Sequence, residues 1–245
     1  MAQYFPELDR YFGQSGSEGL AIVRWCLSPL GIAQLEYEEF VRMVAPGRRL
    51  PTQEQRLRAI WEKATTSVGC KGGEGVVFEA RTMVEELRRI REVIKGTEGE
   101  IETICHGFAE YPHLLTIPGF GPDVSSKVLG AIGDPLRFKK AAQVLKTAGL
   151  DLSADRSGKR SEGVVPVISK NGKADLRYAL YQAALVASTR NREFMRWFTH
   201  KLLGRQREKG IRTKMRVKLT AKMLVIAWTL MKKREPFNPA HLFIA

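Results

Sequence analysis

Apolar residues recur at helical intervals along most of the chain. A spacing of three to four residues places such positions on one face of a helix, and proline and glycine separate the segments that show it. Those segments are residues 18–27, 36–44, 51–68, 173–189, 191–204 and 213–234. The pattern predicts a mainly α protein, with a further helix over 135–150 closed by Gly149 and one short β element in VVPVI at 164–168.

Two of these segments have a clear inward face. Over 173–189 the predicted buried residues are Leu176, Ala179, Leu180, Ala183 and Ala187. Over 213–234 they are Leu224, Trp228 and Met231. Because alanine side chains are small, we expect neighbouring helices to approach the first face closely.

Residues 75–110 carry a longer pattern with the spacing of a coiled coil. One row repeats every seven residues, and a companion row beside it is interrupted by Arg91 and Glu98. The rows are Ala80, Leu87, Ile94, Ile101 and Phe108, and Val77, Val84 and Cys105. Each of Gly96 and Gly99 weakens a helix by about 1 kcal/mol, so we expect a bend or break there. A core helix packed within its own chain and an intermolecular coiled coil both fit this pattern.

Charge is concentrated in the last part of the chain. Residues 1–155 hold 19 Lys and Arg against 21 Asp and Glu, whereas residues 156–245 hold 21 against 5. Such asymmetry indicates nucleic acid or an anionic membrane as partner. Because the cations recur through loops and helices over about ninety residues, nucleic acid is favoured over a basic domain that is merely soluble. The longest apolar run, residues 223–231, is too short to span a bilayer, so we expect no membrane partner and a cytoplasmic, nucleoid-associated location. Three scattered cysteines exclude a disulfide framework and a CxxC metal site.

The sequence IPGFG at 117–121 has the form of a helix-hairpin-helix turn. Gly119 and Gly121 allow a tight turn at the start of a helix, where backbone N–H groups and the helix dipole attract a phosphate oxygen. Lys127 adds a cation one to two turns further on. A plain turn between two helices explains the same residues, and repair glycosylases carry this hairpin with catalytic residues that are missing here.

A second phosphate-handling candidate is the loop 151–172, which contains four cations and several serines. The cations are Arg156, Lys159, Arg160 and Lys170, with Arg177 following on the next predicted helix. The serines are Ser153, Ser157, Ser161 and Ser169, of which Ser157 precedes Gly158. The loop contains no histidine, which argues against a Ser-His-Asp hydrolase, and hydrogen bonding to nearby backbone is the commonest use of a loop serine.

These motifs together resemble a known family. IPGFGPDVSSKVLGAIGD, RF, AGL, RSGKR and ISKNGKADLRYALYQAA follow one another over about residues 117–178, with a weaker likeness back to YFPELDRYF. The order is similar to that in bacterial insertion-sequence transposases that pair a RuvC-like DEDD nuclease domain with a serine-bearing transposase domain. Piv-type DNA invertases are relatives of that family.

The resemblance implies a nucleophilic Ser157 that forms a covalent phosphoserine intermediate with DNA, with guidance by a bridge RNA. It also implies an acidic tetrad with Mg²⁺ in a DEDD domain, which we do not find in these 245 residues. We therefore expect the C-terminal part of a longer recombinase, with no cofactor in this chain, acting as a homo-oligomer or with full-length transposase. The alternatives are a non-catalytic helix-hairpin-helix DNA- or RNA-binding module and an inhibitory transposase fragment.

The expected layout has three parts. Residues 1–74 form a helical linker region, 75–110 a long coiled-coil-like helix, and 111–245 a transposase domain. Within that domain we place the hairpin at 115–148, the serine loop at 151–172 and the basic helices at 173–234.

Overall fold

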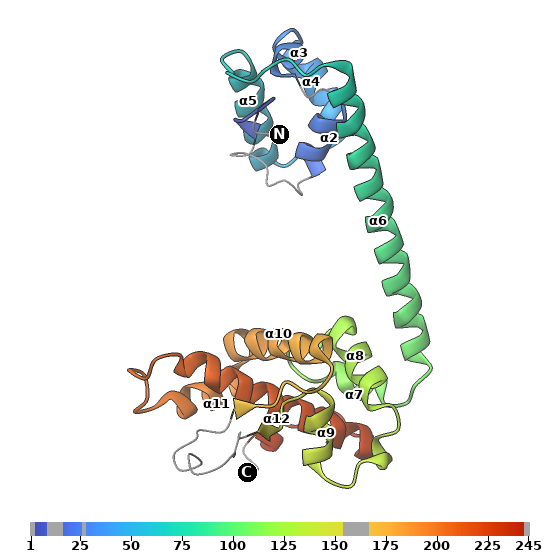
Figure 1. Cartoon of the computed structure of the whole chain (residues 1–245), viewed down its shortest axis with the longest axis vertical. Coiled ribbons are helices and arrows are strands. Elements are labelled where there is room, and N and C mark those ends of the chain that lie inside the picture. The colour runs from blue at the N-terminus through green and yellow to red at the C-terminus, as the bar shows by residue number, and fades with distance from the viewer. Residues whose placement is uncertain (1–2, 9–16, 26–27, 154–166, 243–245) are drawn as a thin grey trace, which may run out of the picture. The chain divides into compact units, whose positions relative to one another are not determined.

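A computed structural model describes residues 3–8, 17–25, 28–153 and 167–242. The described residues are mainly helical, which confirms the predicted fold class (Figure 1). The chain divides into two compact units, Met1–Gly96 and Thr97–Ala245. Each unit has a hydrophobic core of its own and is described separately below.

Before α6, the described part of the N-terminal unit contains the short helices α2 (Ser17–Trp25), α3 (Pro29–Ala33), α4 (Tyr37–Val44) and α5 (Pro51–Ala64). The helices expected over 18–27, 36–44 and 51–68 are thus present, the last beginning at its proline. Phe5, Phe40 and Ile60 are fully buried in the core of this unit. The Trp61 indole fixes the entry to α4 by donating a 2.8 Å hydrogen bond to the Leu35 carbonyl.

Helix α6 (Glu74–His106) is continuous over 33 residues, so the break expected at Gly96 and Gly99 is wrong. Nothing lies within 4 Å of where a Cβ would stand on either glycine. The two glycines therefore cost the helix only their intrinsic propensity, about 1 kcal/mol each. Breaking the helix would remove several backbone hydrogen bonds and would require a second helix to be nucleated. Together these cost more than the two glycines do.

One face of α6 carries a row of exposed apolar side chains. Val84 and Cys105, two members of the predicted companion row, are instead buried. The exposed side chains, joined by the half-buried Leu87 and by Thr97, alternate at intervals of four and three residues. This row, called the α6 seam below, consists of Met83, Leu87, Ile90, Ile94, Thr97, Ile101 and Ile104 on α6, and of Phe108 just after the end of the helix.

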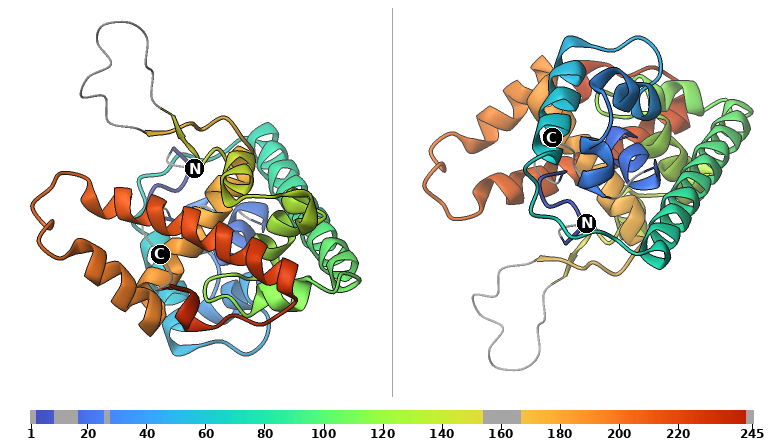
Figure 2. Two further views of the ribbon diagram at one scale, coloured as in Figure 1. Left: turned by 90° about the horizontal axis from the view of Figure 1, so that it is seen from below. Right: turned by 90° about the horizontal axis from the view of Figure 1, so that it is seen from above.

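The C-terminal unit is built around two long helices, α10 (Ala174–Arg190) and α12 (Ile211–Lys233). Helix α10 packs against α12, α8 (Pro122–Ile132) and α11 (Arg192–Leu202) (Figures 1 and 2). The predicted inward residues of α10 and α12 are all buried. The shorter elements are α7 (Tyr111–Leu115), α9 (Ala141–Thr147) and the 3-10 turns η1 (Pro135–Arg137) and η3 (Pro239–Leu242).

The single helix expected over 135–150 is wrong in its first half. The Asp134 carboxylate caps η1 by accepting a 2.8 Å hydrogen bond from the Leu136 N–H. The Gln143 side chain accepts hydrogen bonds from the N–H groups of Lys139 and Lys140, and α9 starts there as a new helix. Side-chain caps thus compete successfully with the helical continuation. The end is as predicted, with Gly149 in a left-handed conformation at φ 61°.

The expected β element is present as β2 (Val167–Ile168), which pairs antiparallel with β1 (Leu152–Ser153). None of the described helices, α12 included, combines the length and the apolar character that a bilayer span requires.

Candidate nucleic-acid interface

The two glycines of the hairpin turn have different surroundings. Gly119 has φ 90°, and a Cβ there would lie 2.5 Å from the Ala183 carbonyl oxygen of α10. Gly121 has φ −105°, caps the start of α8, and has nothing within 4 Å of a Cβ position. The fold therefore requires Gly119 for packing, whereas the space beside Gly121 is open to a ligand.

Lys127, the cation predicted to assist the hairpin, already has a partner. Its ammonium lies 2.6 Å from the Asp123 carboxylate, one turn earlier on α8. The Asp123 side chain is largely exposed and that of Lys127 is partly exposed, so the pair is weak and exchangeable. A phosphate at the start of α8 would have to displace the Asp123 carboxylate from Lys127.

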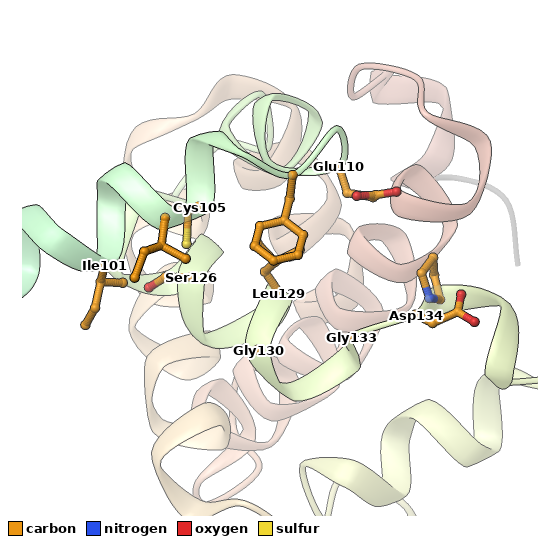
Figure 3. Close-up of a pocket in the computed structure, with 11 residues that line it drawn as sticks. Ile101, Cys105, Glu110, Ser126, Leu129, Gly130, Gly133 and Asp134 are labelled. Carbon is orange, nitrogen blue, oxygen red and sulfur yellow. The ribbon is translucent and has the colours of Figure 1, made fainter.

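A mostly apolar groove of about 590 Å³ is lined by the end of α6 and by α8 (Figure 3). It is lined by Ile101 and Cys105 from α6 and by Ser126, Leu129 and Gly130 from α8, among others. Burial, and to a smaller extent the nearby Glu102 carboxylate, raises the pKa of the Cys105 thiol. A protonated thiol among apolar side chains offers no nucleophile, so this groove suits packing and not catalysis.

The serine loop emerges from the β1–β2 ladder, in which Leu152 pairs with Ile168 and Ser153 with Val167. Four predicted site residues on it, Ser157, Arg156, Lys159 and Arg160, lie outside the described residues. What the structure describes is the ladder that brings the two ends of the loop together and the residues just beyond it.

Those residues hold the base of the loop firmly. The Ser169 hydroxyl donates a 2.6 Å hydrogen bond to the Asp151 carboxylate, and the Ser169 N–H donates a 2.8 Å bond to the Asp151 carbonyl. Ser169 is thereby committed to a structural contact. Lys170 has the left-handed φ of 57°, which costs an L-residue about 1–2 kcal/mol, and its side chain is exposed.

Arg177 connects α10 to this base. Its Nη1 donates hydrogen bonds to the carbonyls of Ala148 at 2.8 Å and Lys170 at 3.4 Å. The structure thus brings two predicted site residues, Lys170 and Arg177, together. Gly119 packs at Ala183, six residues and about 240° further around α10, so the hairpin and the loop base lie against different faces of that helix.

Sequence reasoning missed two aromatic residues beside Arg177. Tyr178 and Tyr181 line a groove of about 420 Å³ with Arg177, Ile168 and Val217. Tyr178 is 66% exposed, which is unusual for a large ring. The sequence did contain a signal for this groove: Tyr178 and Tyr181 are three residues apart and flank the row of residues predicted to be buried on this helix.

Comparison with known proteins matches residues 111–199 to the Transposase IS116/IS110/IS902 family. A "Pilin gene-inverting protein" of Moraxella bovis is 31% identical over 63% of this chain and 48% of its own length. An "Insertion element IS110 uncharacterized 43.6 kDa protein" of Streptomyces coelicolor is 24% identical over 75% of this chain and 45% of its own.

An "Insertion element IS116 uncharacterized 44.8 kDa protein" of Streptomyces clavuligerus is 20% identical over 96% of this chain and 58% of its own length. The chain therefore spans about half the length of the curated relatives it matches.

Proposed function

Because the chain carries a domain of the Transposase IS116/IS110/IS902 family, we propose that it takes part in DNA strand exchange with Ser157 as the nucleophile. The observation that supports this most is the β1–β2 ladder, which closes the loop containing Ser157 next to Lys170 and Arg177. The ladder brings Ser153 and Val167, which flank the segment containing Ser157, together beside those cations. Positioning of the reacting groups is the main requirement of phosphoryl transfer.

The proposed step conserves the number of phosphodiester bonds. Ser157 Oγ attacks the phosphorus, the bond from phosphorus to one bridging oxygen breaks, and that oxygen leaves as a strand-end hydroxyl carrying a proton. The serine proton passes to a base, for which Asp155 is the candidate in the loop. A hydroxyl of the partner strand then attacks the phosphoserine and restores Ser157.

Lys170 and Arg177 would neutralise the negative charge that develops on the phosphate. The bonds from Arg177 to the two carbonyls use Nη1, so the remaining guanidinium N–H groups can serve a phosphate oxygen. The hairpin at Gly121 would hold the flanking strand without reading its sequence.

The Mg²⁺ implied by the family resemblance is not assigned to these residues. Among the residues that the structure describes, no three His, Cys, Asp or Glu side chains lie together as a metal site. We assign the metal to the acidic domain of full-length relatives and derive no step through it.

The test is a search for a covalent adduct. Labelled duplex DNA is incubated with the chain, Mg²⁺ and a full-length relative whose own nucleophilic serine is replaced by alanine, and the protein is resolved under denaturing conditions. We expect an adduct on this chain that is lost in Ser157→Ala and kept in the control Ser161→Ala. An adduct that persists in Ser157→Ala contradicts the assignment.

The α6 seam supports a second proposal, that the chain associates with another copy or with a full-length relative. The alternating spacing of four and three residues is that of the a and d positions of a coiled coil. In a parallel pair, Glu86 of one helix and Arg91 of the other occupy the flanking positions that form interhelical ion pairs. The apolar groove beside Ile101 and Ile104 continues this surface onto α8.

Sedimentation measures this association. We expect Ile94→Asp/Ile101→Asp to lower the average mass toward that of the monomer, because two charges would enter the seam. The control Arg88→Asp/Lys95→Asp changes exposed residues outside the seam and keeps the assembly. Equal masses for the two variants contradict the role of the seam. The alternative of an inhibitory fragment requires that this chain assembles with a full-length relative. If a mixture with the labelled relative contains no mixed assembly, that alternative is contradicted.

A further inference from the structure

The strongest concentration of charge among the described residues lies on α11, its connection to α12 and the first turns of α12. This segment, residues 190–218, is called the basic hairpin below. It holds eleven Lys and Arg and two Glu, a formal charge of +9 out of +14 for the chain. Its connecting loop reaches outward from the helices of the C-terminal unit (Figure 2).

Both acids of the basic hairpin are already engaged. The Glu208 carboxylate accepts two hydrogen bonds from Arg205, at 2.8 and 2.9 Å. Hydrogen bonding to Arg205 lowers the pKa of Glu208. The Glu193 carboxylate lies 3.4 Å from the Arg196 guanidinium. Little internal charge compensation is therefore left for the other nine cations. The Arg196 guanidinium is itself largely exposed, so its pair with Glu193 is weak and can exchange for a phosphate.

Several of these cations stand where they reduce the stability of the free protein. Helix α12 starts with Arg212 and Lys214, has no acid in its first turn, and is preceded by Gly210, which provides no side-chain cap. A cation in the first turn opposes the helix dipole by about 0.3–1 kcal/mol. Just beyond the basic hairpin, burial and then the charges of its Lys201 and Lys218 lower the pKa of Lys222. Such an arrangement is relieved by a bound anion.

The outer face of α11 forms an open groove of about 680 Å³. Arg192, Arg196 and His200 line it at intervals of four residues, together with the apolar Met195 and Leu203. Eight residues of helix cover about 12 Å, which is the axial length of three to four nucleotides in one strand of a duplex. The groove thus offers a row of donors that matches successive phosphates.

The aromatic residues of the basic hairpin decide between partners. Phe194, Trp197 and Phe198 are all buried, at most 8% exposed. Proteins that bind single strands expose aromatic rings on which bases stack, and helices that lie on membranes insert such rings into the lipid. Buried rings beneath exposed cations favour contact with phosphates of a double helix.

We propose that the basic hairpin is a second nucleic-acid contact, which binds the phosphate backbone of a duplex through Arg192, Arg196 and Arg212, none of which belongs to the serine loop. It deepens the proposed function by giving the domain a holding surface besides the reacting loop. Binding here is independent of base sequence and weakens steeply with salt, because each phosphate contact releases a counterion.

The test measures the affinity for a labelled 25-base-pair duplex by fluorescence anisotropy between 0.05 and 0.3 M KCl. In Arg192→Gln/Arg196→Gln/Arg212→Gln we expect the slope of log K against log salt to flatten by about 0.9 per lost contact, about 2.7 in total. Taken relative to 1 M salt, the same slope corresponds to a loss of affinity of about 500-fold at 0.1 M KCl.

The matched control removes three exposed cations from the N-terminal unit instead, as Arg42→Gln/Arg48→Gln/Lys63→Gln. Both variants have the same net charge, so only the location of the cations differs. Circular dichroism checks that each variant is folded. Equal slopes in the two variants, or no duplex binding by the unchanged chain, overturn the proposal.

Two further ligands in the same assay show which kind of anion the basic hairpin binds. The assay is repeated with an RNA duplex and with phosphatidylserine vesicles. A selective loss of binding to either duplex supports the proposal and names the nucleic acid, whereas a loss confined to vesicles overturns it. The whole series is repeated in Ser157→Ala, because binding needs no strand cleavage. A failed adduct experiment therefore leaves this result unaffected.

A second measurement does not depend on removing charge. Benzoylphenylalanine in place of the exposed Thr199, in the groove, should photo-crosslink to the duplex. The same group in place of the exposed Thr52 of the N-terminal unit is the control. A cross-link at neither position, or at position 52 alone, contradicts the proposal.

Discussion

Gly119→Ala should destabilise the C-terminal unit strongly, because two effects act on the same atom. At φ 90° an alanine costs about 1–2 kcal/mol more than glycine. Its Cβ would also lie 2.5 Å from the Ala183 carbonyl oxygen and 3.3 Å from the Ala187 Cβ. Both contacts are with α10, whose backbone must shift, and such overpacking costs about 1–3 kcal/mol. The expected loss is about 2–5 kcal/mol.

The neighbouring glycine is the matched control. Gly121→Ala adds the same methyl group two residues away, where φ is negative and nothing lies within 4 Å. Alanine is a poorer helix cap than glycine, but it also restricts the unfolded chain, and the two effects nearly cancel to within about 0.5 kcal/mol. If the hairpin holds a phosphate, this stable variant should still raise the Kd for duplex DNA.

Native-state hydrogen exchange with mass spectrometry separates the units. Peptides from α8 and α10 report the free energy of opening of the C-terminal unit, and peptides from α5 serve as an internal reference. We expect α8 and α10 to lose protection in Gly119→Ala, with α5 unchanged. Equal protection in the two variants would show that Gly119 does not approach α10 as described, and the packing argument would then fail.

Three smaller predictions follow from single contacts. Trp228→Phe removes the 2.8 Å bond from the indole N–H to the Pro135 carbonyl, and thermal denaturation should show a loss of about 1–2 kcal/mol. Burial, and then the Glu54 hydrogen bond, raises the pKa of Tyr37 to about 12. As the pH rises, the unfolded chain therefore loses this proton before the folded chain does. The free energy of unfolding, measured by urea titration, should fall between about pH 10 and 12, and this part of the fall should vanish in Tyr37→Phe. Gly96→Ala should raise hydrogen-exchange protection along α6 by about 1 kcal/mol, since alanine suits the open position better.

The helical periodicity located most long elements because burial on one side leaves a three-to-four-residue repeat in the sequence. The inward faces of α10 and α12 follow that rule residue by residue. The division of 135–150 into η1 and α9 did not follow from it. That division depends on side-chain caps from Asp134 and Gln143, which periodicity does not encode.

Local pattern also misjudged α6. The glycine positions suggested a break, but open surroundings on both sides left only a small propensity cost. The seven-residue row was found, whereas its companion row was assigned to the wrong side. Only the folded structure reveals that Val84 and Cys105 are buried, whereas Ile90 and Ile104 are exposed.

The sequence by itself determined the mainly helical class, the order of motifs that carries the family resemblance, and the accumulation of cations after residue 155. These follow from local spacing and from composition, which need no long-range contacts. The tertiary structure decided that Gly119 packs on α10, that Arg177 ties α10 to the loop base, and that α11 and α12 gather their cations on one hairpin. Each of these depends on which helices meet, and contacts between residues distant in the chain leave no periodic trace in the sequence.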